Sequence, residues 1–185
     1  MDPGRLYSAF LKHVAQTSNA PIGLVVESAS GCRIRTFDGR EYLDLLAGIG
    51  VSALGHGNPK ITAAITEQAQ RHLHVMVYGE FVQETQVLLA ERLTGLLPDE
   101  LETVYFTNSG AEAIEGTLKL VRKATGRSRV LSFRGGFHGD TLGAVSLGGN
   151  PVYRDPFEPL LPGIDFLDFN DQAGFDRIDS SVAPL

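Results

Sequence analysis

The sequence is poor in cysteine, in clusters of one charge and in long apolar runs. Its single cysteine, Cys32, has no partner for an internal disulfide, so a disulfide framework is excluded. The formal net charge is −6 and Lys and Arg do not gather in one stretch, so no nucleic-acid partner is expected. Polar or charged residues soon interrupt every apolar stretch, so no membrane-spanning helix is expected either. Residues 1–16 carry charges inside their apolar pattern, unlike a secretory signal, and we expect a cytoplasmic protein.

The composition that remains is that of an ordinary globular protein, with 43% hydrophobic residues among 185. Helical spacing of apolar residues predicts a helix over residues 5–17. Two β-rich runs, residues 23–30 and 32–37, lead to a turn at Asp38-Gly39 and to residues 41–46, which predicts small antiparallel strands. A glycine-rich loop follows, and Pro59 suits the first position of a helix that runs to about His72. A second helix is expected over about residues 80–97.

The second half of the chain alternates strands with helices. Strands are predicted at residues 102–107, 129–133 and 164–169, with a helix over about residues 111–126 and a short one at 141–148. Strand–helix alternation predicts an α/β fold with a mainly parallel sheet. No closing element is evident at the end of the chain, so we expect an incomplete domain.

The first candidate site is FTNSGAEA, residues 106–113, in which a predicted strand feeds a short turn and a helix. The first amides of a helix have no intrahelical partner and the helix dipole makes that end positive. Ser109 can add a hydroxyl and Gly110 permits close approach, so the turn is a plausible phosphate cradle. The alternative is that Asn108 or Ser109 is an ordinary helix cap.

The second candidate is FRGGFHGDT, residues 133–141, which follows the next strand and would emerge at the same edge of the sheet. Phe137 lies between glycines and could stack on a flat ring or fold back onto the core. His138 could move a proton, orient a ligand or simply bond to backbone. No metal site is predicted, because His72 and His74 have no companion ligands.

Taken together, these strings resemble the class-III aminotransferases, a branch of the fold-type-I pyridoxal-phosphate enzymes. That family includes acetylornithine, ornithine and 4-aminobutyrate aminotransferases. The matching strings are DGREYLDLLAGIGVSALGHGNPKI, YGEFVQ, FTNSGAEAIEGTLKLVRKATGR and FRGGFHGDT, in the family's order and spacing. The resemblance implies the N-terminal part of the fold-type-I architecture, a mainly parallel sheet with flanking helices. Residues 1–50 would belong to the small domain and residues 51–185 to the first part of the large domain that binds pyridoxal 5′-phosphate.

The resemblance also implies roles for single residues. The family's phosphate-binding turn maps to Ser109, Gly110 and Ala111. The aromatic residue that stacks on the pyridine ring maps to Phe137, and His138 follows beside the ring.

A loop near the substrate mouth maps to Gly48 and Ile49. Ornithine aminotransferases usually carry Tyr where this chain has Ile49, whereas acetylornithine and 4-aminobutyrate types tend to carry Ile, which leans away from free ornithine. Family members form homodimers with shared active sites, and Tyr78 and Phe81 would pack near that interface.

Transamination requires a lysine that forms a Schiff base and a carboxylate on the pyridine nitrogen. In the family both residues lie beyond the point where this chain ends. Lys12, Lys60, Lys119 and Lys123 all fall on predicted helices, so none is assigned as the Schiff-base lysine and no catalytic residue is assigned.

Three interpretations remain open at this point. The chain is part of an aminotransferase that moves an amino group from an ω- or δ-amino substrate to 2-oxoglutarate, and is inactive alone. Otherwise it is a non-catalytic module that binds a phosphate-bearing ligand, or one half of a split enzyme that another chain completes.

Overall fold

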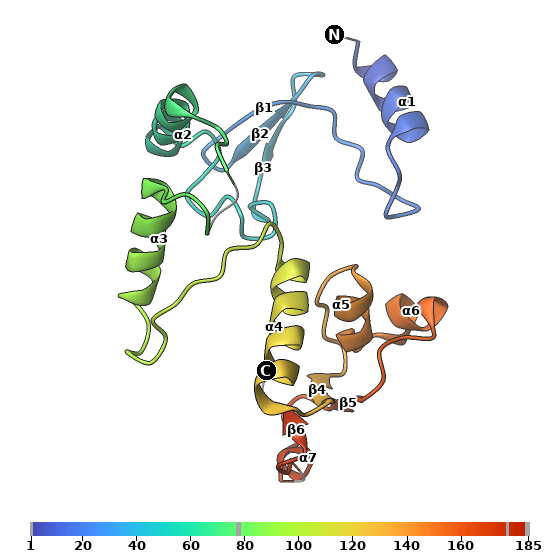
Figure 1. Cartoon of the computed structure of the whole chain (residues 1–185). Helices are drawn as coiled ribbons and strands as arrows, with labels where there is room; N and C mark the ends of the chain where they lie inside the picture. Colours follow the sequence, from blue (N-terminus) through green and yellow to red (C-terminus); the bar gives the residue numbers. More distant parts are fainter. Residues whose placement is uncertain (1, 77–78, 177, 184–185) are drawn as a thin grey trace. The chain divides into compact units, whose positions relative to one another are not determined.

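The computed structural model describes residues 2–76, 79–176 and 178–183, and its elements are shown in Figure 1. The chain forms two compact units, Met1–Val82 and Gln83–Leu185. The units are described separately below. The expected assignment of residues 1–50 and 51–185 to a small and a large domain stays a prediction.

The first unit holds two helices and an antiparallel sheet. Helix α1 (Pro3–His13) begins where the Asp2 carboxylate accepts a hydrogen bond from the Gly4 amide, and it ends four residues earlier than expected. Strands β1 (Val26–Ser30), β2 (Arg33–Thr36) and β3 (Glu41–Leu43) pair in that order, all antiparallel. The small antiparallel segment expected from the sequence is therefore confirmed.

Helix α2 (Pro59–Arg71) closes the first unit and matches the expected bounds within one residue. It begins there because the Asn58 side chain accepts from the Lys60 amide and Pro59 has no amide hydrogen to satisfy.

The second unit alternates helices with parallel strands. Its elements are α3 (Glu84–Thr94), α4 (Gly110–Thr125), β4 (Arg129–Phe133), α5 (Leu142–Leu147), α6 (Pro151–Arg154), η1 (Asp155–Phe157), β5 (Ile164–Leu167), α7 (Gln172–Phe175) and β6 (Val182–Ala183). The strand order is β5-β4-β6, and β4 pairs parallel with both neighbours. The predicted α/β class with a parallel sheet and flanking helices is confirmed.

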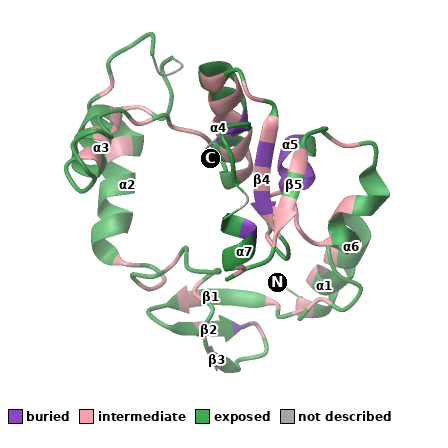
Figure 2. Ribbon diagram, turned by 90° about the horizontal axis from the view of Figure 1, so that it is seen from below, coloured by how far each residue is buried: buried purple, intermediate pink, exposed green. Residues whose placement is uncertain are grey.

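The core of the second unit lies where α4 and α5 cover the central strand β4, as the buried segments in Figure 2 show. Val130, on β4, is fully buried and packs with Leu118 of α4, Leu147 of α5 and Ala183 of β6. Ile114 and Val121, three or four residues from Leu118 on α4, pack against the same core, so α4 turns one apolar face to it.

Two further expected elements differ from the structure. No strand forms at residues 102–107 in the described chain, because a strand needs a neighbouring strand to accept its hydrogen bonds and none of β4, β5 and β6 pairs with this segment. Helix α3 is shorter than the expected residues 80–97, because it begins at Glu84 and ends at Thr94. Tyr78 lies outside the described residues, and Phe81 is half exposed. No helix of the described chain has both the length and the apolar character to cross a membrane.

Candidate functional site

The start of α4 is fixed by a reciprocal pair of hydrogen bonds between side chains and backbone. Ser109 is the N-cap, and its hydroxyl oxygen accepts from the Glu112 amide at 3.1 Å. The Glu112 carboxylate reaches back and accepts from the Asn108 amide at 2.7 Å. A serine followed three residues later by a glutamate is the sequence signal of a capping box, and here the glutamate accepts from the residue just before the N-cap. Of the two caps that the sequence left open, Asn108 and Ser109, the structure therefore has Ser109.

Capping leaves several donors free at the same end of α4. Within the described chain, the amides of Gly110 and Ala111 have no hydrogen-bond partner. The Ser109 oxygen accepts from Glu112, so its own hydroxyl hydrogen remains available. These three donors lie at the positive end of a helix of 16 residues. The cap and the phosphate cradle are therefore compatible readings of one turn.

Gly110 adds an observation that favours an anion. A Cβ built on this residue meets no atom within 4 Å, and its φ is not in the left-handed region. Neither packing nor backbone geometry thus requires glycine here. A phosphate that approaches the backbone closely would require it, because a side chain would occupy the same space. The residues present at this turn fit a phosphate group.

The loop between β4 and α5, residues 134–141, lies against the start of α4. A Cβ on Gly139, whose φ is +118°, would come within 2.5 Å of the Ala111 Cβ. The base of the loop is held by a hydrogen bond from the Gly149 amide to the Gly136 carbonyl at 2.9 Å. The structure therefore brings the two motifs singled out from the sequence into direct contact.

His138 is oriented by a buried serine of β4. The Ser132 hydroxyl donates to the Leu147 carbonyl at 2.6 Å, and its oxygen lies 3.2 Å from His138 Nε2. A hydroxyl has one hydrogen, and a carbonyl can only accept. His138 Nε2 must therefore be the donor to Ser132. In the neutral imidazole, Nδ1 then keeps a lone pair that can accept a hydrogen bond from a ligand.

Phe137 points its ring toward solvent, with 67% of the residue exposed. Phe133 behaves differently, since its ring contacts those of Phe169 and Phe175. The alternative in which Phe137 folds back onto the core is therefore wrong. An exposed ring beside the imidazole is free to stack on a flat ligand, and this role stays a prediction.

Gly48 and Ile49 belong to the first unit, in a turn with an uncommon backbone. Four successive residues, 47–50, have positive φ, with values of 48°, 60°, 60° and 84°. Ile49 is β-branched and 93% exposed, so neither backbone preference nor burial explains its place at φ +60°. Such strain persists only where the surrounding structure imposes it.

Sequence reasoning missed the pair that surrounds this turn, Asp44 and His56. The Asp44 carboxylate lies 2.6 Å from His56 Nε2 and also accepts from the Leu46 and Ala47 amides, at 2.9 and 3.0 Å. The hydrogen bond from His56, followed by those from the two amides, lowers the pKa of the Asp44 carboxyl. The Asp follows a strand and the His precedes a helix N-cap, but a spacing of twelve residues across an irregular loop has no periodic signal.

Glu115, in the second turn of α4, was not among the candidate site residues. Its carboxylate accepts from the Gly143 amide at 2.9 Å and so joins α4 to the first turn of α5. A Cβ on Gly143 would come within 2.4 Å of that carboxylate, so a larger residue would displace the Glu115 side chain from this hydrogen bond.

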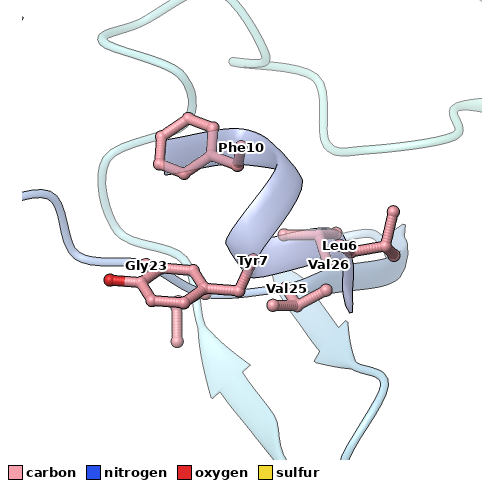
Figure 3. A pocket seen from close by; sticks show the side chains of 7 residues that line it. Leu6, Tyr7, Phe10, Gly23, Val25 and Val26 are labelled. Carbon is pink, nitrogen blue, oxygen red and sulfur yellow. The ribbon is translucent and has the colours of Figure 1, made fainter. Parts of the chain in front are cut away.

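A further pocket lies in the first unit, between α1 and residues 23–26 (Figure 3). It has a volume of about 320 Å³ and is lined by apolar side chains, with Tyr7 and Phe10 on the helix side. The Tyr7 ring lies beside Gly23, where a Cβ would come within 2.9 Å of it. This lining offers no charged group for an amine or a phosphate, so the candidate site stays at the start of α4.

The four lysines lie where the sequence predicted them. Lys12 is on α1, Lys60 is on α2, and Lys119 and Lys123 are on α4. Lys119 and Lys123 are in the middle and last turn of α4, away from its N-terminal donors.

Fold and site together define an α/β protein with a phosphate-type cradle at a helix N-terminus, beside an aromatic–imidazole loop. The chain belongs to the class-III aminotransferase family, whose model matches residues 14–183. Pyridoxal phosphate is the cofactor of this family.

Relatives in other organisms extend well beyond the matched region. The chain is 40% identical over 176 residues to the acetylornithine aminotransferase of Methanopyrus kandleri, covering 94% of this chain and 44% of that protein. It is 37% identical over 167 residues to the acetylornithine aminotransferase of Archaeoglobus fulgidus, covering 90% and 43%. The chain thus spans less than half the length of these relatives.

Solved structures show the same relation. An ornithine aminotransferase from Toxoplasma gondii superposes with a TM-score of 0.88 at 25% identity, covering 99% of this chain and 44% of that one. The taurine:2-oxoglutarate aminotransferase of Bifidobacterium kashiwanohense, solved with pyridoxal phosphate and glutamate, gives a TM-score of 0.83 at 26% identity, covering 97% and 40%.

Proposed function

We propose that the protein containing this chain is a pyridoxal-phosphate-dependent aminotransferase. It transfers an amino group from an acetylornithine-, ornithine- or 4-aminobutyrate-like donor to 2-oxoglutarate. The observation that carries the proposal is the start of α4, where Ser109, Gly110 and Ala111 offer free donors around an open space. Family membership supplies the reaction class.

In this proposal the described residues bind and orient the cofactor. The Ser109 hydroxyl and the amides of Gly110 and Ala111 hold its phosphate, at the positive end of α4. Phe137 stacks on its ring, and His138, fixed by Ser132, presents a hydrogen-bond acceptor through Nδ1. When bound, the cofactor supplies an electron sink for the transfer of the amino group.

The chain by itself is inactive in this proposal, because none of its four lysines lies at the cradle. The complete enzyme is a cytoplasmic homodimer, as the resemblance and the N-terminal pattern suggested.

Among these donors the proposal favours one whose α-amino group is acylated or absent, as in N-acetylornithine or 4-aminobutyrate, over free ornithine. Two kinds of support exist: Ile49 stands where ornithine-specific members usually carry Tyr, and several relatives at 37–40% identity are acetylornithine aminotransferases. The likeness to an ornithine aminotransferase structure, at 25% identity, concerns the family architecture.

The first experiment is the intact mass of the protein from its native source, followed by transaminase assays on that protein. A mass more than twice the 19.9 kDa of this chain, with transfer to 2-oxoglutarate, is the expected result. A mass near 19.9 kDa with cofactor binding and no turnover would favour the non-catalytic module. The same mass with a co-purifying chain that restores turnover would favour a split enzyme.

The cradle is tested with Gly110→Val in the complete protein. The added side chain fills the space a phosphate would occupy, and losing charge-assisted hydrogen bonds should weaken pyridoxal phosphate binding by about tenfold or more. Ala113→Val, an exposed position on the same helix, is the matched control and should leave affinity unchanged. Equal affinity of both variants for pyridoxal phosphate would place the phosphate elsewhere.

A further inference from the structure

The turn at residues 47–50 is enclosed by a network that joins both ends of its loop. Asp44 follows β3, and His56 lies two residues before the N-cap of α2. Their side chains meet at 2.6 Å, with 9% of the Asp44 side chain and 22% of the His56 side chain exposed. The loop of residues 45–55 is therefore closed at its base by one mostly buried ion-pair-type contact.

Both members of the pair are also tied to the turn between β1 and β2. The Asp44 amide donates to the Cys32 carbonyl at 2.8 Å, and the backbone of His56 exchanges two hydrogen bonds with Gly31, at 2.8 and 2.9 Å. A Cβ on Gly55 would approach the Gly31 Cα to 3.3 Å, so the loop base is close-packed against this turn. The backbones of Asp44 and His56 are thus both anchored to this turn.

The Asp44 carboxylate then acts directly on the strained segment. One oxygen faces His56, while the other accepts from the amides of Leu46 and Ala47, the residues that lead into the left-handed run. The Gly50 amide donates to the Leu46 carbonyl and the Ser52 amide to the Ala47 carbonyl. These hydrogen bonds therefore tie the run to residues 46 and 47, whose amides Asp44 holds.

We propose that Asp44 and His56 are positioning residues, which form a clasp that holds Ile49 in its exposed left-handed conformation and so sets the selection of the amino donor. The inference rests on the proposed function, in which Ile49 faces the donor. Without the clasp, the loop relaxes to ordinary backbone angles, because a β-branched residue disfavours positive φ. The Ile49 side chain then moves away from its contact with the amino donor.

The test uses His56→Phe, which keeps ring volume and removes the bond to Asp44, and His56→Gln, whose amide can donate to the carboxylate. His13→Phe, the same change at an exposed position on α1, is the control. Amide exchange at Leu46 and Ala47 is measured in the complete protein. Michaelis constants for N-acetylornithine, ornithine and 4-aminobutyrate are measured together with affinity for pyridoxal phosphate.

In His56→Phe we expect exchange at both amides to rise about tenfold or more, as for a lost hydrogen bond to a charged group. The ratio of the KM values for the different donors should fall by a similar factor, and the affinity for pyridoxal phosphate should be unchanged. His56→Gln should restore most of the slow amide exchange and most of the donor preference. His13→Phe should change neither the exchange rate nor the donor preference.

Unchanged exchange in His56→Phe would overturn the clasp. Faster exchange with an unchanged donor preference would overturn its role in donor selection. If the unmodified protein transfers no amino group from any of these donors, the proposed function fails and the role in selection fails with it. The exchange result then still decides separately whether the pair holds the turn.

Discussion

The contact between Gly139 and Ala111 can be tested by adding a single methyl group. Gly139→Ala introduces two costs: a non-glycine residue at φ +118° and a Cβ at 2.5 Å from the Ala111 Cβ. Backbone strain of this kind costs about 1–3 kcal/mol. Normal contact between carbon atoms is about 3.5–4.0 Å, so the loop must shift by about 1 Å, and overpacking of this kind costs about 1–3 kcal/mol more.

Gly135 in the same loop provides a matched control. Its φ is +78°, but a Cβ there meets no atom within 4 Å. Gly135→Ala should therefore destabilise by the strain alone, about 1–3 kcal/mol. The double change Gly139→Ala with Ala111→Gly removes the clash and should recover the steric part, less up to about 1 kcal/mol for a glycine inside a helix.

The assay is urea unfolding of the purified protein followed by circular dichroism, with pyridoxal phosphate titrations of the same variants. Gly139→Ala should be the least stable and should lose the most cofactor affinity, because the loop carrying Phe137 and His138 moves away from α4. Equal destabilisation by Gly135→Ala and Gly139→Ala, with no recovery from Ala111→Gly, would refute the described contact between loop and helix.

Three further outcomes are expected. Leu147→Ala removes a fully buried core side chain and should lower the free energy of unfolding by about 2–5 kcal/mol, measured by urea unfolding; a loss below 1 kcal/mol would contradict its place in the core. Ser132→Ala should free the His138 ring, seen in ¹⁵N spectra as a loss of the fixed Nε2–H tautomer, while unaltered ring signals would show that Ser132 does not orient it. The lowered pKa of Asp44 stabilises the fold above about pH 4, and this contribution is lost as pH falls through the folded-state pKa. The stability difference between the unmodified protein and Asp44→Ala should therefore shrink on acidification, and a difference independent of pH would contradict the hydrogen bonds to the ionised Asp44 carboxylate.

The sequence predicted elements that carry a local pattern. Helix α4 has a cap, an apolar stripe and a C-terminal glycine, Gly126, in the left-handed conformation. Strand β4 alternates buried and half-buried residues, as a central strand does. The parallel sheet followed from strand–helix alternation. The prediction of a strand at residues 102–107 was wrong because a strand forms only when a second segment pairs with it. The residues of one segment carry no information about that partner.

The candidate site was predictable only in part, for the same reason. Ser109 and Gly110 stood out because a helix start follows from adjacent residues. The contacts that orient the site join distant residues: Gly139 with Ala111, Ser132 with His138, and Glu115 with Gly143. Asp44 and His56 escaped notice because their geometry arises from a loop whose backbone angles no local preference would choose.

The contacts that shape the phosphate cradle all close within residues 107–149. Short sequence separation lowers the entropy lost on forming contacts and favours rapid formation. A ribosome adds residues at about 5–20 per second, so this segment emerges within several seconds. The cradle can then assemble early in synthesis, and cofactor present in the cell can meet its phosphate-binding turn while the polypeptide is still being extended.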